Sequence, residues 1–393
     1  MVVVDIRNFF EERNVDLIEV NNDFIYYSEE KSQEGHNNLF LLEYNRVTKR
    51  ERIIVNYSLD DPSFNQHMFS FENSIILLLE NESNVFWVFK IDKKTGEETT
   101  RLKSDCIGSF DGCTMLDENN FIIYSKADAY TAKVFDDYEK ATGCSHIACL
   151  YNINDGKRSF IKDKRIYKNP PSNITTYDYK GKPQVLILEP YGDEALKEKC
   201  YKNSRWINTN ICDYIWTCPL DTLISDIKNE KSEISMKLIV KASTEGMARF
   251  CGMDDEFIYF RAGNFKTLED CICTYSKNTS EIKILTPLTY ENNCYYHIDI
   301  SETKVYRISE DNNMFRVTGV VNSNVYGEYS VSLGEFIGFI DDRYLIIKKS
   351  TNFEDSNGTV EYNSIFDTEN LTEENFECKC CIKGDTLVLY WSL

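Results

Sequence analysis

The sequence lacks the short motifs that mark the commonest catalytic sites. It contains no Gly-x-Ser-x-Gly elbow, no glycine-rich phosphate loop, no dinucleotide-binding fingerprint and no His-Glu-x-x-His motif. Asp and Glu number 64, too many to select a glycosidase pair, because such a pair is defined by its separation in space. The sequence therefore favours a protein that is not an enzyme, and it indicates no catalytic residue, no metal and no cofactor.

Glycine and proline are also scarce, with 17 and 7 residues in a chain of 393. This scarcity excludes collagen-like chains and most disordered ones. Tyrosine (25) and phenylalanine (23) are abundant instead, and hydrophobic residues make up 42% of the chain. Aromatic residues are enriched in β-strands, so the composition predicts a β-rich protein with ample core.

Positive charge is in deficit. Lys and Arg number 44 against 64 acidic residues, which gives a formal charge of -20. Binding to nucleic acid depends on clustered Lys and Arg that contact phosphates, and an anionic membrane surface would repel the chain for the same reason. We therefore expect neither nucleic acid nor membrane as a partner. Net charge bears on solubility more than on fold, so a soluble acidic surface is the simplest interpretation.

Long hydrophobic runs are missing as well. The N-terminus has no basic region followed by an apolar stretch and a small-residue cleavage site, and runs such as Ile75–Leu79 are far too short to span a bilayer. If the chain is complete, these absences predict a cytoplasmic protein. The alternative is an extracellular protein from which a signal peptide has been removed.

Fourteen cysteines are unusual for a cytoplasmic chain. Most lie inside strand-like runs such as Cys271-Ile-Cys273, whereas disulfide frameworks belong to small secreted domains, so we expect buried free thiols. Cys144, His146 and Cys149 suggest a metal site. On a strand, however, Cys149 points away from the other two, so no metal is expected there.

A phrase of a polar turn followed by four aliphatic or aromatic residues recurs along the chain. The clearest copies are Phe24–Tyr27, Phe121–Tyr124, Phe257–Phe260 and Tyr344–Ile347. Each is preceded by another short strand-like run and followed by a second hairpin with Asn, Asp or Gly at its turn, which is hairpin chemistry. Each repeat therefore contains four antiparallel strands, the content of a β-propeller blade.

The hairpin turns Lys94-Thr-Gly-Glu97 and Asn154-Asp-Gly-Lys157 carry a resemblance to bacterial β-propellers. The resemblance covers nearly the whole chain, and it implies one all-β domain over residues 1–393. The Trp-Asp ending of WD40 blades, the kelch glycine doublet and the Ser-x-Asp-x-Gly box of sialidases are absent. Propellers of this kind include binding scaffolds, carbohydrate-active enzymes and lactonases, so the resemblance fixes no activity.

The number of blades depends on how residues 289–333 are divided. Seven second hairpins are complete if 305–308 is the third strand of its blade, but there are eight candidate second strands if 387–391 is included. We favour seven blades, with eight as the alternative. In the seven-bladed arrangement, 2–6 and 387–391 pair or lie side by side to close the ring, which removes exposed strand edges.

Two connections between the second and third strands of a blade are much longer than the others, at 127–145 in blade 3 and 190–212 in blade 4. In a propeller both would rise from one face. Tyr130, Val134, Tyr138 and Ala141 have the spacing of a short amphipathic helix that ends at Gly143, and 193–201 is also compatible with a helix. Candidate binding residues on these insertions are Tyr130, Lys133, Asp137, Tyr138, Arg205 and Trp206.

The mouth of the central channel is the other candidate site, since the first strand of every blade ends there. Its candidate residues are His67, Asp111, Arg249, Tyr296, His297 and Glu335. Long loops on a rigid scaffold often carry function. The leading hypothesis is therefore a monomeric intracellular propeller that binds a protein or peptide on the insertion face. The alternative is a propeller enzyme or small-molecule binder that acts on a sugar or lactone in the channel.

Overall fold

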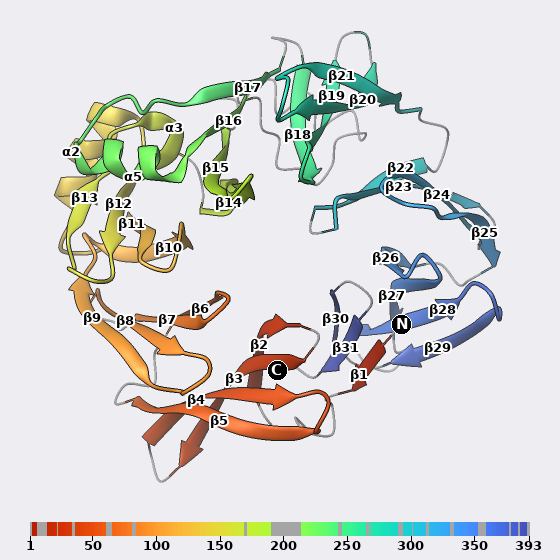
Figure 1. Cartoon of the computed structure of the whole chain (residues 1–393), viewed down its shortest axis with the longest axis horizontal. Coiled ribbons are helices and arrows are strands. Elements are labelled where there is room, and N and C mark those ends of the chain that lie inside the picture. Colours follow the sequence, from red (N-terminus) through yellow and green to blue (C-terminus); the bar gives the residue numbers. More distant parts are fainter. Residues whose placement is uncertain are drawn as a thin grey trace.

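The computed structural model shows an all-β ring of seven four-stranded antiparallel blades (Figure 1). It describes residues 2–5, 14–21, 23–33, 36–59, 65–80, 84–168, 171–189, 214–242, 246–264, 267, 269–289, 294–300, 302–311, 314–330, 334–352, 359–376, 379–383 and 386–390. The strands of each blade follow one another in sequence and in space. The predicted β-propeller fold is thus confirmed.

The strand bounds are as follows. Blades 1 and 2 contain β2 (Asn14–Val20), β3 (Phe24–Gln33), β4 (His36–Asn45), β5 (Arg50–Leu59), β6 (Asn65–Ser70), β7 (Ser74–Glu80), β8 (Val85–Asp92) and β9 (Glu98–Asp105). Blades 3 and 4 contain β10 (Ser109–Met115), β11 (Asn120–Lys126), β12 (His146–Asn152), β13 (Arg158–Phe160), β14 (Ile174–Tyr179), β15 (Lys182–Glu189), β16 (Tyr214–Pro219) and β17 (Lys237–Lys241). Blades 5 to 7 contain β18 (Gly246–Met253), β19 (Phe257–Asn264), β20 (Asp270–Ser276), β21 (Ile282–Pro287), β22 (Cys294–Asp299), β23 (Lys304–Asp311), β24 (Met314–Val321), β25 (Tyr326–Ser330), β26 (Glu335–Ile340), β27 (Tyr344–Asn352), β28 (Thr359–Asp367) and β29 (Thr372–Phe376).

The recurring aromatic phrase forms the second strand of a blade. In β7 every residue is buried, whereas in the outer strand β9 exposed and half-buried residues alternate. A second strand has a neighbouring blade on both of its faces, so it reads as a continuous apolar run. An outer strand meets water and needs polar residues, which explains why the phrase is not repeated there.

A three-stranded sheet closes the ring between blades 7 and 1. β31 (Thr386–Tyr390) pairs in antiparallel fashion with β30 (Lys379–Lys383) and in parallel with β1 (Val2–Asp5), in the register Val4 to Val388. Leu387 and Leu389 pack against blade 7, while Val388 packs against Val15, Val20 and other core residues of blade 1. The two ends of the chain therefore share one sheet that joins the first and last blades.

The register of blade 6 departs from one sequence expectation. Residues 305–308 lie in β23, which pairs with both β22 and β24. They therefore belong to a second strand, and their interpretation as a third strand is wrong. The first strand of this blade, β22, contains Tyr295, Tyr296 and His297, whose polar groups hid its apolar pattern.

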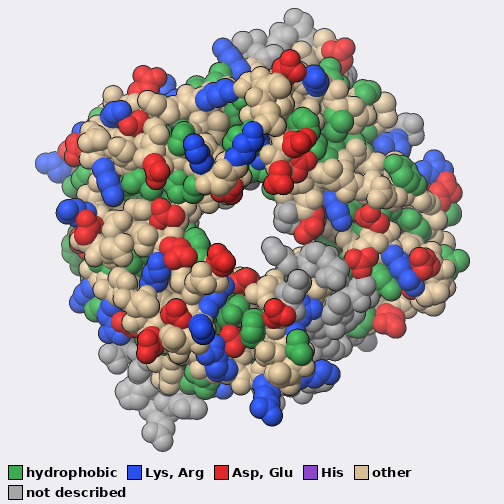
Figure 2. All heavy atoms as spheres, viewed as in Figure 1, with side chains coloured by type: hydrophobic (Ala, Val, Ile, Leu, Met, Phe, Trp, Pro, Cys, Tyr) green, Lys and Arg blue, Asp and Glu red, His purple; other side chains and the backbone are tan. Residues whose placement is uncertain are grey.

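The first strands of the blades line the centre of the ring (Figure 1). Figure 2 shows an opening through the middle, with acidic side chains around its rim on the face in view. Connections from second to third strands and from fourth to first strands end on one face of a propeller, and the other connections end on the opposite face. We call the face with the second-to-third and fourth-to-first connections the insertion face, because the 127–145 connection lies on it.

In the part of the chain that the structure describes, helices lie at blades 3 and 4. α2 (Ala132–Thr142) follows β11, α3 (Lys164–Tyr167) and the 3₁₀ turn η1 (Pro171–Asn173) connect these blades, and α5 (Leu220–Lys228) joins β16 to β17. α2 confirms the predicted helix in blade 3, and Gly143 ends it with φ of 67°. The predicted insertion at 190–212 lies outside the described residues. No helix in the described part is long and apolar enough to cross a membrane.

Candidate binding face on blade 3

The turn that leads into α2 is fixed by Asp128. Its carboxylate accepts hydrogen bonds from the backbone N–H groups of Tyr130 (2.8 Å) and Thr131 (2.7 Å), from the Thr131 hydroxyl (2.7 Å), and from Asn84 Nδ2 (2.6 Å). The hydrogen bond from the Thr131 side chain is the main cause that lowers the pKa of Asp128. Because Asn84 belongs to blade 2, this carboxylate ties the insertion to the neighbouring blade.

α2 is held down through Phe135. This side chain is buried among Phe110, Ile147 and other core residues between blades 2 and 3. Gly108 makes room for it, since a Cβ atom there would lie 2.7 Å from Cε2 of Phe135. The Tyr138 ring packs at 6.0 Å from that of Tyr167, in an edge-on arrangement. Phe135 and Tyr138, three residues apart, are therefore the inward face of the helix.

The structure divides the four residues that share helical spacing in the sequence. Tyr138 is half-buried, but Tyr130, Val134 and Ala141, which the helical spacing grouped with it, are exposed. We call Tyr130, Val134, Asp137 and Ala141 the α2 stripe. Tyr130 is 96% exposed and Val134 is 53% exposed. The blade thus presents an aromatic and an aliphatic side chain to solvent on a firmly anchored support.

The other candidate residues on the insertions are divided by the structure. Lys133 and Asp137 are exposed, whereas Tyr138 is half-buried and burial raises its pKa. Tyr138 packs against the core clusters on both sides of blade 3, so it supports the helix rather than presenting a surface. Arg205 and Trp206 lie outside the described residues.

The channel candidates of blades 2 and 3 are engaged locally. The His67 ring lies 5.0 Å from that of Phe110, and burial lowers the pKa of His67. Asp111 carboxylate oxygens lie 3.1 Å from Lys126 Nζ and 2.9 Å from His146 Nε2. His67 and Asp111 therefore make contacts within their own blade or with the neighbouring blade.

Two further candidates, Arg249 of blade 5 and Glu335 of blade 7, act on the pKa of His297 in blade 6. His297 packs edge-on against Phe336 at 5.0 Å. Burial lowers the pKa of His297, with Arg249 acting in the same direction and Asp299 and Glu335 acting against it. Tyr296 points elsewhere and donates a hydrogen bond to the Thr289 carbonyl at 2.9 Å. Arg249 and Glu335 therefore act on His297, whereas Tyr296 is hydrogen-bonded to the backbone of Thr289.

The described residues offer little for metal chemistry. Among them, no group of three or more His, Cys, Asp or Glu side chains is arranged to hold a metal ion. Cys144 and Cys149, from the run that suggested a metal, are both buried. Burial raises the pKa of Cys149 to about 12, so its thiol stays protonated near neutral pH.

Comparison with known proteins finds likeness at the level of the fold. No protein-family model matches the chain, and no curated protein does so either. Similar solved structures include an uncharacterized protein from Listeria monocytogenes, with 9% identity, a TM-score of 0.42, and coverage of 95% of this chain and 96% of that one. The β-propeller domain of the Trilobed protease from Pyrococcus furiosus has 11% identity and a TM-score of 0.41, with 92% and 97% covered. TolB from Acinetobacter baumannii has 10% identity and a TM-score of 0.31, with 93% and 82% covered.

Proposed function

We propose that this propeller binds a protein or peptide partner through the α2 stripe. The observation that carries the proposal is Tyr130, which is 96% exposed yet sits on a turn fixed by four hydrogen bonds to Asp128. Tyrosine is enriched among the residues that dominate protein interfaces. A backbone that is already ordered loses little entropy on binding, so a fixed turn favours recognition.

Tyr130→Ala is expected to weaken binding of such a partner about 30-fold, which corresponds to about 2 kcal/mol for an interface hot spot. The partner is first sought by quantitative affinity purification with the tagged wild-type chain, and its affinity is then measured with purified components. Val47→Ala is the matched control. Val47 is an exposed apolar residue in the turn between β4 and β5, on the opposite face.

The substitution is preferable to deleting 129–143. That deletion would remove Phe135 and expose the core between blades 2 and 3, so lost binding could reflect lost folding. Tyr130→Ala and Val134→Ser change exposed side chains, and such changes usually alter stability by no more than about 0.5 kcal/mol. A partner that binds the doubly substituted protein as well as the wild type would rule out the α2 stripe.

A small molecule in the central channel is the second candidate. The observation in its favour is that His297 of blade 6 packs against Phe336 of blade 7 at 5.0 Å, next to Glu335, and that Arg249 and Glu335 both act on the pKa of His297. A panel of sugars and lactones can be screened by thermal shift. Stabilisation that is lost in Glu335→Gln but kept in Tyr130→Ala would support the channel, and stabilisation unaffected by Glu335→Gln would count against it.

A further inference from the structure

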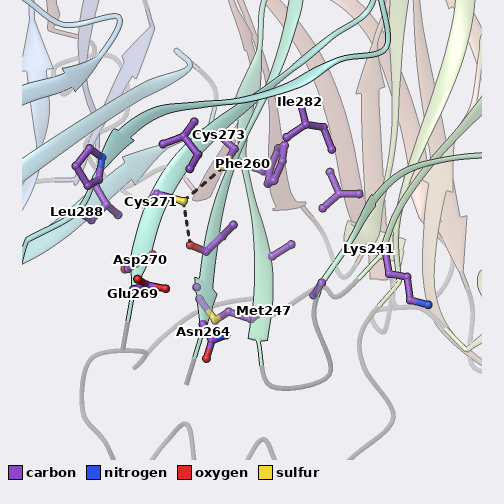
Figure 3. A pocket seen from close by; sticks show the side chains of 17 residues that line it. Lys241, Met247, Phe260, Asn264, Glu269, Asp270, Cys271, Cys273, Ile282 and Leu288 are labelled. Atoms are coloured by element: carbon purple, nitrogen blue, oxygen red, sulfur yellow. Dashed lines mark hydrogen bonds between the residues drawn. The ribbon is translucent and has the colours of Figure 1, made fainter. Parts of the chain in front are cut away.

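A cavity of about 740 Å³ lies between blades 4 and 5 (Figure 3). Binding sites for small molecules commonly occupy about 300–1,000 Å³. The residues around it come from the end of β17 and from all four strands of blade 5: Val240, Lys241, Ala242, Met247, Ala248, Phe260, Ala262, Gly263, Asn264, Glu269, Asp270, Cys271, Cys273, Ile282, Ile284, Pro287 and Leu288. The cavity is thus large enough for a drug-sized ligand.

The wall of this cavity is mainly apolar. Met247, Phe260 and Leu288 contribute buried surface, and Ile282 and Ile284 extend the apolar lining onto the outermost strand β21. Ile284 is 69% exposed, an unusual position for an aliphatic side chain next to a concave surface. A pocket with an apolar wall and few polar groups favours an uncharged, apolar ligand.

Much of the cavity lies towards the insertion face. Lys241 and Ala242 stand at the end of the fourth strand of blade 4, Asn264 at the end of a second strand, and Glu269 and Asp270 at the start of a third. These strand ends belong to the same face as the connection that contains α2. The cavity is nevertheless on a different pair of blades, so it is a separate site.

Two thiols stand on its wall. Cys271 and Cys273 alternate along β20 and therefore share a face, and their Sγ atoms lie 3.5 Å apart. Cys271 is half-buried and its Sγ lies 3.6 Å from the Ala262 carbonyl, while Cys273 is buried. Figure 3 shows the Cys271 sulfur between these two contacts. The more accessible thiol, Cys271, is thus in contact with a second, buried thiol.

The two thiols are not equivalent. A hydrogen bond from Cys273 lowers the pKa of Cys271, against the opposing effect of burial. The same hydrogen bond is the first cause of the raised pKa of Cys273, which remains a protonated donor. Cys271 is also the more accessible of the two, and since the thiolate is the nucleophilic form, Cys271 is the reactive member of the pair.

We propose that this cavity binds small apolar molecules and that Cys271 adds covalently to those that carry an α,β-unsaturated carbonyl group. In this addition Cys271 Sγ forms a bond to the β-carbon of the alkene. The alkene electron pair shifts towards the carbonyl, and the proton lost from the thiol ends on the α-carbon. Nothing is oxidised or reduced, so the step needs no co-reactant.

The test uses N-phenylmaleimide as the apolar electrophile and N-(4-carboxyphenyl)maleimide as a charged counterpart of similar size. Peptide mapping by mass spectrometry is expected to find Cys271 modified first among the cysteines. We compare the ratio of the two labelling rates, apolar reagent over charged reagent. At Cys271 this ratio should be at least tenfold larger than the same ratio measured with a free thiol in solution. Cys271→Ser should remove this fast phase.

Binding is separated from mere accessibility by N-phenylsuccinimide, which has the same ring but no alkene. It should protect Cys271 in a saturable way, and Ile284→Asp, which places a charge beside the cavity, should weaken that protection at least tenfold. Leu371→Asp, at an exposed leucine on blade 7, should have no effect. Absence of saturable protection would overturn the binding site, and slow or unselective labelling of Cys271 would overturn its covalent role.

The role of Cys273 predicts a change in pH dependence. The labelling rate of Cys271 should rise with pH and level off above its pKa, because only the thiolate reacts. Cys273→Ala removes the hydrogen bond that lowers this pKa, so the profile should shift to higher pH. Cys273→Ser keeps a donor and should shift it less. Identical profiles for the wild type and Cys273→Ala would show that Cys273 does not activate Cys271.

Discussion

Asp270→Ala is expected to lower the free energy of unfolding by about 3–5 kcal/mol, the usual cost of breaking a buried ion pair from one side. Asp270 accepts hydrogen bonds from Arg261 Nε at 2.9 Å and from Nη2 at 2.6 Å, across the β19–β20 pair. The side chains of Arg261 and Asp270 are only 4% and 1% exposed. Without this carboxylate, the guanidinium loses these hydrogen bonds at a position that water hardly reaches.

Urea denaturation measures this loss, and blade 5 provides a matched control. Glu281 pairs with Lys283 at 3.4 Å, but both side chains are exposed. Glu281→Ala should therefore change stability by no more than about 1 kcal/mol. The double substitution Arg261→Met/Asp270→Leu should recover much of the loss, because apolar residues often replace a buried pair without cost. Equal stability losses for Asp270→Ala and Glu281→Ala would contradict the buried-pair argument.

The blades could be predicted from the sequence because their hydrophobic pattern is local. Phe121–Tyr124 lies in β11, between β10 and β12, and neighbouring blades cover both faces of its blade. The adjoining turns contain Asp, Asn and Gly, so the hairpins that flank this strand could also be predicted from the sequence. Strand content and blade order follow from such short-range signals.

The orientation of α2 could not be predicted from periodicity. Tyr130, Val134 and Ala141 make one apolar stripe, and Phe135 and Tyr138 make another, so either could have faced the core. The choice depends on the space above Gly108, which accepts the Phe135 ring. Gly108 is 27 positions away from Phe135 in the sequence, and no pattern within the helix indicates that space.

The cavity could not be predicted from the sequence either, because it also depends on tertiary packing. Cys271 and Cys273 lie in a strand-like run, and buried structural thiols are the common case for such residues. Their alternation showed that they share a face, but not that this face borders an open space. The cavity depends on how blades 4 and 5 meet, which is a tertiary property.

Ring closure leads to the other large expected effect. Val388→Asp should lower the free energy of unfolding by about 3–5 kcal/mol, because it places a carboxylate among buried apolar side chains. Val388 is fully buried against Val15, Ile25 and Tyr27 of blade 1. Val47→Asp, at an exposed turn of the same blade, is the control and should change stability by no more than about 0.5 kcal/mol.

Hydrogen exchange distinguishes loss of closure from general weakening. If β31 is the link between the first and last blades, Val388→Asp should speed exchange most in β1, β31 and the β2–β3 pair, because local opening lets water reach the new carboxylate. Exchange in β10–β12, across the ring, should change least. Since β31 pairs with β1 and also packs on blades 1 and 7, a uniform acceleration around the ring would mean that unfolding is global and that this sheet is not a separate latch.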